Sequence, residues 1–287
     1  MPSLAVSPLA NADLSWWEAA ILGLVEGLTE YLPVSSTGHL LVTAELLGLN
    51  ETAASEAAIE TFAICIQIGA IFAVLVLYWN RIRQMLDGLL GRSDEGRQVL
   101  IAVITAFIPT AILGVTFFDF VQEKLFGVGP IAWAWLIGGI GVLVLSRTDW
   151  FDRASGEITE LTMGKAAIIG VAQAMAAWPG VSRSLITIIA CIAVGLKLAA
   201  AVEFSFLLGL ITLSAATVYE GLRGGQEMID TFGFVTPLIG LIVGFVSAVA
   251  AVRWMVAWLN EKGFEVFGWY RIAIGILALV LLATGTL

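Results

Sequence analysis

The sequence predicts an all-helical integral membrane protein with six transmembrane helices and two re-entrant helical hairpins, arranged as inverted-topology repeats. Three observations predict this fold. Of the 287 residues, 59% are hydrophobic and only 13% are charged, which is far from the composition of a soluble domain. Long apolar stretches recur along the chain, and two further apolar regions are each interrupted by proline and a polar cluster. These two interrupted regions also resemble each other in sequence.

Six apolar stretches are long enough to cross the hydrocarbon core, which takes about 20 helical residues. They cover residues 60–79, 98–118, 130–146, 203–222, 232–258 and 266–286. The two interrupted regions, 14–48 and 164–197, are expected to enter the membrane and turn back, because Pro33 and Pro179 break them near the middle. Backbone outside a helix survives at that depth only where protein or a wet cavity satisfies its amides.

The basic residues predict how the chain is oriented, because short cytoplasmic loops of membrane proteins collect Lys and Arg. If both interrupted regions are re-entrant, 11 of the 14 basic residues fall on one side and both termini lie outside the cytoplasm. The 11 residues are Arg81, Arg83, Arg92, Arg97, Arg147, Arg153, Lys165, Lys197, Arg253, Lys262 and Arg271. The net charge of −9 gives the whole molecule no attraction to nucleic acid, so no nucleic-acid partner is expected.

A shift of 147 residues aligns the two interrupted regions. It lays ILGLVEGLTEYLPV at 21–34 over IIGVAQAMAAWPGV at 168–181, and it brings Ser36 opposite Arg183. The alternative is chance similarity between two membrane segments that are rich in glycine and alanine. We interpret the match as an internal repeat.

The repeat predicts one membrane domain, residues 1–287, with a first repeat at about 14–146 and a second at about 164–286. The first interrupted region would enter from outside and the second from the cytoplasm, so the repeats are inverted. Folds of this kind place a polar site where the two broken helices meet, with helix N-termini facing an anion.

Glu26 and Glu30 are four residues apart, so in a helix both carboxylates project from one face. An ionisable residue at the centre of a membrane helix costs roughly 2.5 to 3.5 kcal/mol, and two close carboxylates also repel each other. A divalent cation, a shared proton or Arg183 could offset this cost. The alternative is that this helix end lies in headgroups or water and that both carboxylates are solvated.

Polar residues directly after this pair point to phosphate chemistry. Ser35, Ser36 and Thr37 are followed by His39, the single histidine of the chain. Hydroxyls and free amides before a helix bind phosphate oxygens, and a nearby imidazole can act as nucleophile or as general acid or base. His39 is therefore predicted to be catalytic, although a lone histidine is more often structural.

The second cluster supplies a complementary charge. Ser182, Arg183 and Ser184 follow Pro179, and Thr187 lies one turn further on. The planar fork of an Arg side chain can grip phosphate oxygens in two places, and a helix N-terminus adds to the attraction. The alternative is that Arg183 merely neutralises Glu26 or Glu30.

The two clusters closely resemble the signature motifs of a known family. EGLTEYLPVSSTGHL at 26–40 and PGVSRSLIT at 179–187 are similar to the two motifs of the bacterial undecaprenyl-diphosphate phosphatases, the bacitracin-resistance family. The similarity continues through IQIGAI at 66–71, EFSFLL at 203–208 and YRI at 270–272. The resemblance implies a multi-pass enzyme of the bacterial inner (plasma) membrane that recycles a lipid carrier for peptidoglycan synthesis, with a site open to the periplasmic or extracellular side.

The residue patterns and the resemblance together predict the members of the site. The expected catalytic residues are Glu26, Glu30, Ser36, His39 and Arg183. The expected substrate-binding residues are Ser35, Thr37, Ser182, Ser184 and Thr187. Glu26 and Glu30 are also the expected ligands of a divalent cation, Mg²⁺ or Ca²⁺. The expected partners are a polyprenyl diphosphate lipid and the membrane, and a homodimer is left open.

The sequence departs from the family at two positions. Leu185 stands where the family usually has glycine, and Gly209 stands where it usually has proline. We expect Leu185 to narrow the turn beside Arg183 and the lost proline to straighten a helix kink.

Hydrolysis of undecaprenyl diphosphate to the monophosphate and phosphate is the preferred function. The alternative is a secondary transporter or lipid flippase, because inverted repeats with broken helices are a transporter architecture. A transporter needs no acid, base or nucleophile, so His39 beside the glutamate pair favours hydrolysis.

Overall fold

The computed structural model describes residues 14–49, 53–150 and 154–287. In these parts the chain is helical, apart from turns and one isolated bridge between Gly156 and Leu196. Six helices are long and apolar enough to cross a membrane. Their candidate spans are Ile59–Leu77, Asp94–Phe117, Val128–Ser146, Leu198–Gln226, Val235–Leu259 and Glu265–Ala283. Each span overlaps one of the six predicted stretches, so the prediction of six apolar spans is confirmed.

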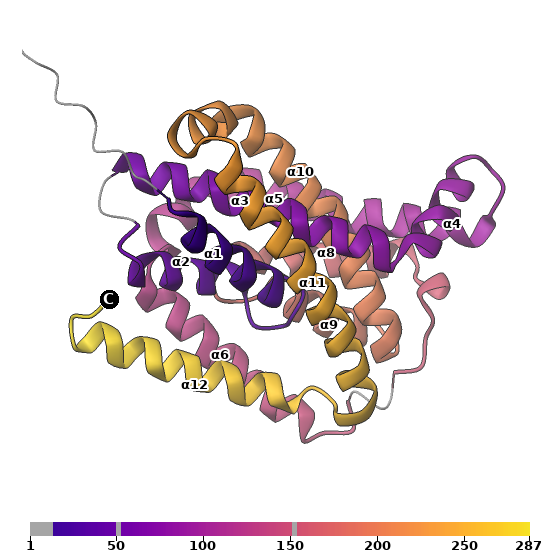
Figure 1. The fold of residues 1–287 in the computed structure, drawn as a ribbon. Helices are drawn as coiled ribbons and strands as arrows, with labels where there is room; N and C mark the ends of the chain where they lie inside the picture. The colour runs from indigo at the N-terminus through magenta and orange to yellow at the C-terminus, as the bar shows by residue number, and fades with distance from the viewer. Residues whose placement is uncertain (1–13, 50–52, 151–153) are drawn as a thin grey trace, which may run out of the picture.

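The six long helices form the frame of the bundle, and one short helix lies at its edge, against the ends of two of them (Figure 1). They are α3 (Ala53–Leu77), α5 (Asp94–Leu125), α6 (Val128–Ser146), α10 (Leu198–Phe232), α11 (Val235–Lys262) and α12 (Glu265–Ala283), and the short helix is α4 (Trp79–Leu89). The sequence sets their ends locally. At the start of α5, the Ser93 hydroxyl accepts a hydrogen bond from the Gly96 amide at 3.0 Å. At the ends of α10 and α11, Gly233 and Gly263 adopt positive φ, which glycine tolerates.

Each interrupted region forms two short helices. The first contains α1 (Trp16–Thr29) and α2 (Ser36–Leu46), and the second contains α8 (Met163–Ala174), the 3₁₀ turn η2 (Met175–Ala177) and α9 (Arg183–Ala193). The longest of them, α1, has 14 residues. At 1.5 Å per residue it measures about 21 Å, which is short of the roughly 30 Å of the hydrocarbon core. A single one of these helices therefore does not cross the membrane.

The two breaks share an unusual backbone conformation. Ser35 has a φ of 74° and Ser182 a φ of 75°, and they are the two residues other than glycine with positive φ in the described part of the chain. They are separated by 147 residues, which is the shift that aligns the interrupted regions. Such backbone strain costs of order 1–3 kcal/mol per residue and is found mostly at functional sites.

Small residues let the short helices approach the long ones closely. α1 packs along α11, and α8 packs along α5. A Cβ atom at Gly23 would lie 2.2 Å from the carbonyl oxygen of Gly240, and one at Gly170 would lie 2.0 Å from that of Ala106. Small residues at such contacts allow the close helix packing that is typical of membrane proteins.

The loops that carry most basic residues lie toward one end of the helix bundle. In Figure 1, α4, the segment after α6 and the α11–α12 turn lie toward the right, whereas the C-terminus and the α10–α11 turn lie toward the left. The N-terminus and Arg153 fall outside the described residues. The assignment of Arg271 to a loop is wrong, because this residue lies within α12 and its side chain is 0% exposed.

Candidate active site

Two buried carboxylates lie at the end of α1. Glu26 is in the last turns of α1 and Glu30 directly follows the helix. Their exposed fractions are 1% and 7%. The interpretation that both carboxylates are solvated is therefore wrong, and protein groups must compensate for the buried charge.

Both oxygen atoms of Glu30 are held by the two residues that the 147-residue shift aligns with each other. Arg183 Nη2, at the start of α9, donates to Glu30 Oε1 at 2.8 Å, and Ser36 Oγ, at the start of α2, donates to Glu30 Oε2. Arg183 Nη1 also donates to the backbone carbonyl of Ser205 at 3.1 Å. The guanidinium carbon lies 5.3 Å from the centroid of the Tyr31 ring. This ion pair joins the two interrupted regions.

Polar atoms of the cluster, and the hydroxyl of the neighbouring Tyr31, are left without a partner among the described residues. Glu26 Oε1 and Arg183 Nε are buried and have no hydrogen-bond partner among the residues that the structure describes. Glu30, Arg183 and Gln67 are the groups that lie beside Glu26. The buried cluster therefore keeps one acceptor and one donor that a bound group could still satisfy.

Hydroxyl groups of each break bond to the backbone of the other break. Ser35 Oγ accepts a hydrogen bond from the Gly180 amide at 3.1 Å, and Ser184 Oγ donates to the Leu32 carbonyl at 2.8 Å. Ser182 Oγ lies 3.0 Å from Ser184 Oγ. Ser35 and Ser184, two of the predicted hydroxyl residues, therefore link the two breaks.

Thr187 and Thr37 differ in their surroundings. Thr187 is fully buried, and its hydroxyl lies 2.5 Å from Ser205 Oγ. Ser205, which also binds Arg183, lies on α10 within the EFSFLL segment. Sequence reasoning did not assign it to the site, although a buried polar residue in an apolar helix was an available signal. Thr37 lies in the first turn of α2, and its side chain is exposed.

His39 makes its hydrogen bonds with groups other than the two glutamates. Its Nδ1 lies 2.6 Å from the Ser35 carbonyl oxygen, and its Nε2 lies 2.9 Å from the Tyr270 hydroxyl. The imidazole also contacts the Trp135 ring, with 4.9 Å between the centroids. The structure thus brings Glu26, Glu30, Ser36 and Arg183 together and places His39 on the side of α6 and α12.

Arg271 binds the backbone of both breaks. Its Nη1 donates to the Pro33 carbonyl at 3.3 Å, and its Nη2 donates to the Gly180 carbonyl at 2.8 Å and to the Ala134 carbonyl of α6 at 3.0 Å. Pro33 and Gly180 are equivalent under the 147-residue shift. A charge count along the sequence could not find this role, because the partners are carbonyl oxygens, which every residue has.

Leu185 and Gly209, the two departures from the family motifs, lie in different surroundings. Leu185 is buried in the main hydrophobic cluster, and its amide donates to Ser182 Oγ at 3.3 Å. Gly209 lies on α10, which runs unbroken from Leu198 to Phe232. A Cβ atom at Gly209 would lie 2.0 Å from Arg183 Nη1, so the absence of a side chain there makes room for the guanidinium.

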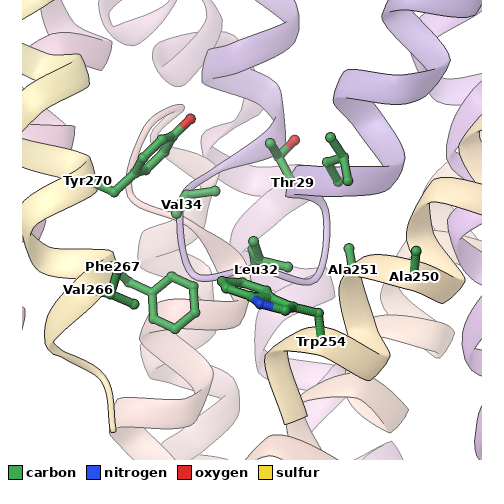
Figure 2. A pocket seen from close by; sticks show the side chains of 10 residues that line it. Thr29, Leu32, Val34, Ala250, Ala251, Trp254, Val266, Phe267 and Tyr270 are labelled. Carbon is green, nitrogen blue, oxygen red and sulfur yellow. The ribbon is translucent and has the colours of Figure 1, made fainter. Parts of the chain in front are cut away.

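An apolar cavity of about 440 Å³ lies beside the first break. Figure 2 shows Leu32 and Val34 of the break, Trp254 of α11, and Phe267 and Tyr270 of α12 around it. The remaining lining residues are Leu28, Thr29, Ala250, Ala251 and Val266. The cavity offers an apolar ligand a place next to the polar cluster.

The chain is similar to known proteins over most of its length. The family model described as bacitracin resistance protein BacA matches residues 19–277. An undecaprenyl-diphosphatase of Sorangium cellulosum is 40% identical over 268 residues, which covers 92% of this chain and 85% of the relative. An undecaprenyl-diphosphatase of Deinococcus radiodurans is 39% identical over 280 residues, which covers 96% and 98%. The undecaprenyl-diphosphatase 2 of Rhodospirillum rubrum is 40% identical over 267 residues, which covers 93% and 94%.

Proposed function

We infer that this chain, which belongs to the bacitracin resistance protein BacA family, is an undecaprenyl-diphosphatase. It hydrolyses undecaprenyl diphosphate to the monophosphate and inorganic phosphate, and it is a multi-pass membrane protein. The two motifs that carried the resemblance lie against each other in the fold, joined by the ion pair between Arg183 and Glu30. Family membership and geometry therefore favour the same reaction.

We propose that Arg183 binds the diphosphate, and the unpaired Arg183 Nε carries this proposal. A buried N–H donor on a permanent cation is costly unless an acceptor reaches it, and a phosphate oxygen is such an acceptor. The N-terminus of α9, which begins at Arg183, adds to the attraction for an anion. Phosphoryl transfer depends mainly on positioning and on stabilising charge, which these groups supply.

Ser36 is the best-placed nucleophile among the site residues. Its hydroxyl already donates to Glu30, which is the arrangement of a nucleophile beside its base. In the proposed step, Ser36 Oγ or a water in its place forms a bond to the terminal phosphorus while Glu30 accepts the proton. The bond from this phosphorus to the bridging oxygen breaks, and undecaprenyl monophosphate leaves. If Ser36 has attacked, water then releases the phosphate from it.

We propose that Glu26 and Glu30 hold a divalent cation, Mg²⁺ or Ca²⁺, together with oxygens of the diphosphate. The free Oε1 of Glu26 supports this, because it is a buried oxygen ligand without a partner. Two carboxylates face one guanidinium, and the substrate adds further negative charge. No third His, Cys, Asp or Glu residue joins them among the described residues, so substrate and water would complete the ligand set. The ion would supply charge neutralisation.

The apolar cavity supports a role in binding the prenyl chain. It lies beside Leu32, whose carbonyl binds Ser184 of the second break, so a lipid in it would have its head near the polar cluster. The lining is almost entirely hydrocarbon, which suits an isoprenoid chain and no charged group.

The function is tested with purified protein in detergent, where no membrane gradient exists. We expect phosphate release from undecaprenyl diphosphate, loss of this release with excess chelator and its return with Mg²⁺ or Ca²⁺. The protein should hydrolyse shorter prenyl diphosphates with a higher KM, because a shorter chain fills less of the apolar cavity. A transporter or flippase would release no phosphate in this assay. Full activity in excess chelator would contradict the proposed divalent cation but not the phosphatase function.

We propose that the two interrupted regions are re-entrant and belong to inverted repeats. The nearly equal φ values of Ser35 and Ser182 support this, as do the contacts of α1 with α11 and of α8 with α5. The distribution of basic residues favours a cytoplasmic α4 and a site that opens to the outside.

Labelling of intact cells with a membrane-impermeant maleimide tests this orientation, in a chain with Cys65 and Cys191 changed to alanine. Thr286→Cys should react at once, and Arg92→Cys only after the cells are opened. The reverse pattern would invert the proposed orientation.

A further inference from the structure

Tyr270 of α12 contacts the imidazole of His39 from the far end of the chain. Its hydroxyl lies 2.9 Å from His39 Nε2. The two rings are nearly parallel, with an interplanar angle of 8° and 5.7 Å between their centroids. Trp135 of α6 contacts the same imidazole. The ring of His39 is therefore fixed by two other helices and not by α2 alone.

The hydrogen-bond partners of His39 determine which ring nitrogen carries the proton. Nδ1 lies 2.6 Å from the carbonyl oxygen of Ser35, and a carbonyl oxygen can only accept a hydrogen bond. Nδ1 therefore carries a proton. In the neutral imidazole the lone pair is then on Nε2, which accepts a hydrogen bond from the Tyr270 hydroxyl.

Tyr270 also lies between the imidazole and the apolar cavity. It is one of the residues that line this cavity. Figure 2 shows its hydroxyl directed away from Phe267 and Trp254, which form the opposite part of the lining. The lone pair of His39 thus faces a side chain that borders the space proposed for the lipid.

We propose that Tyr270 is a positioning residue for His39. Its hydroxyl stabilises the tautomer with the lone pair on Nε2 and fixes the plane of the ring, so that Nδ1 holds the carbonyl of Ser35 in place beside Ser36, which donates to Glu30. This role rests on the proposed function. Packing of the Tyr270 ring alone would not require the hydroxyl, so removal of this one group separates the two roles.

The single histidine of the chain gives the proposal a direct spectroscopic test. Untagged protein labelled with ¹⁵N-histidine in detergent should show a protonated Nδ1 and a bare Nε2. Tyr270→Phe should shift the Nε2 signal and lower kcat about tenfold, with KM and the unfolding temperature unchanged. The matched control is Tyr219→Phe, because the Tyr219 hydroxyl binds Arg223 on the exposed face of α10. This control should leave both readouts at the parental values.

The contrary results distinguish a failure of the Tyr270 role from a failure of the proposed function. A protonated Nε2 in the parent, an unshifted signal in Tyr270→Phe or a parental kcat in that variant would overturn the role of Tyr270. A loss confined to KM would also overturn it, because it would indicate that the hydroxyl only binds substrate. A parent chain that releases no phosphate from undecaprenyl diphosphate would overturn the proposed function itself, and the role of Tyr270 with it.

Discussion

Arg183→Ala is expected to lose nearly all undecaprenyl-diphosphatase activity, by roughly 10²- to 10³-fold or more in kcat/KM. The guanidinium joins Glu30 to the backbone of Ser205, and its Nε is the unpaired donor proposed for the diphosphate. If the contact strengthens as charge builds in the transition state, the loss should appear in kcat more than in KM. Steady-state phosphate release in detergent measures both constants.

Arg183→Lys separates the charge from the shape of the side chain. A lysine keeps the positive charge beside Glu30 but lacks the planar fork, so it cannot serve Glu30, Ser205 and a phosphate at once. We expect it to retain the fold and to lose most of kcat/KM, roughly 10- to 100-fold. The comparison needs variants whose thermal unfolding matches the parent, because breaking a buried ion pair itself costs about 3–5 kcal/mol. Near-parental turnover by a well-folded Arg183→Ala would contradict the phosphate site.

Gly209→Ala tests the same site without touching a charged group. The added Cβ would lie 2.0 Å from Arg183 Nη1, so the guanidinium must move away from Glu30 or Ser205. Loss of either contact misplaces the guanidinium and is expected to lower kcat/KM by roughly 10- to 100-fold. Gly221→Ala on the same helix is the matched control, because its Cβ would meet nothing within 4 Å. Equal activity of the two variants would show that the position of Arg183 is unimportant.

The sequence predicted the parts of the fold that follow from composition and spacing. The six apolar stretches became six long helices because a span needs a fixed number of apolar residues. Glu30, Ser36 and Arg183 were predicted to share a site, and they are in contact. In a chain that is otherwise apolar, charged and hydroxyl groups find hydrogen-bond partners mainly in one another. The chemical roles assigned to these residues stay predictions.

The parts that could not be predicted depend on the packing of distant helices. Gly209 and Tyr270 lie on α10 and α12, far along the chain from the first motif, and no local pattern marks them as neighbours of the site. His39 was expected beside the glutamate pair because it follows them closely in sequence. Its ring nitrogens lie at hydrogen-bond distance from the Ser35 carbonyl and the Tyr270 hydroxyl, and the contact with Tyr270 of α12 is one that the sequence did not indicate.

Arg271→Met is expected to destabilise the protein and to lower its activity together. Methionine is an unbranched apolar side chain that fills part of the space of the arginine. It leaves the carbonyls of Pro33, Gly180 and Ala134 without their donors. A buried polar group without a partner costs about 1–3 kcal/mol, so a loss of several kcal/mol is expected. Two of these carbonyls belong to the tips of the two breaks, so their relative position should relax. Thermal unfolding in detergent and steady-state kinetics measure the two effects.

Arg253→Met on α11 is the control for loss of a positive charge in a long helix, because Arg253 is exposed. It should leave both unfolding temperature and kcat near the parental values. Arg271→Lys should be intermediate, since an ammonium group can donate to these carbonyls but cannot span them as the fork does. The expected order of unfolding temperature is the parent, then Arg271→Lys, then Arg271→Met, and kcat should follow the same order because both motifs are carried on the two tips. Parental stability and turnover in Arg271→Met would contradict the view that this guanidinium joins the breaks.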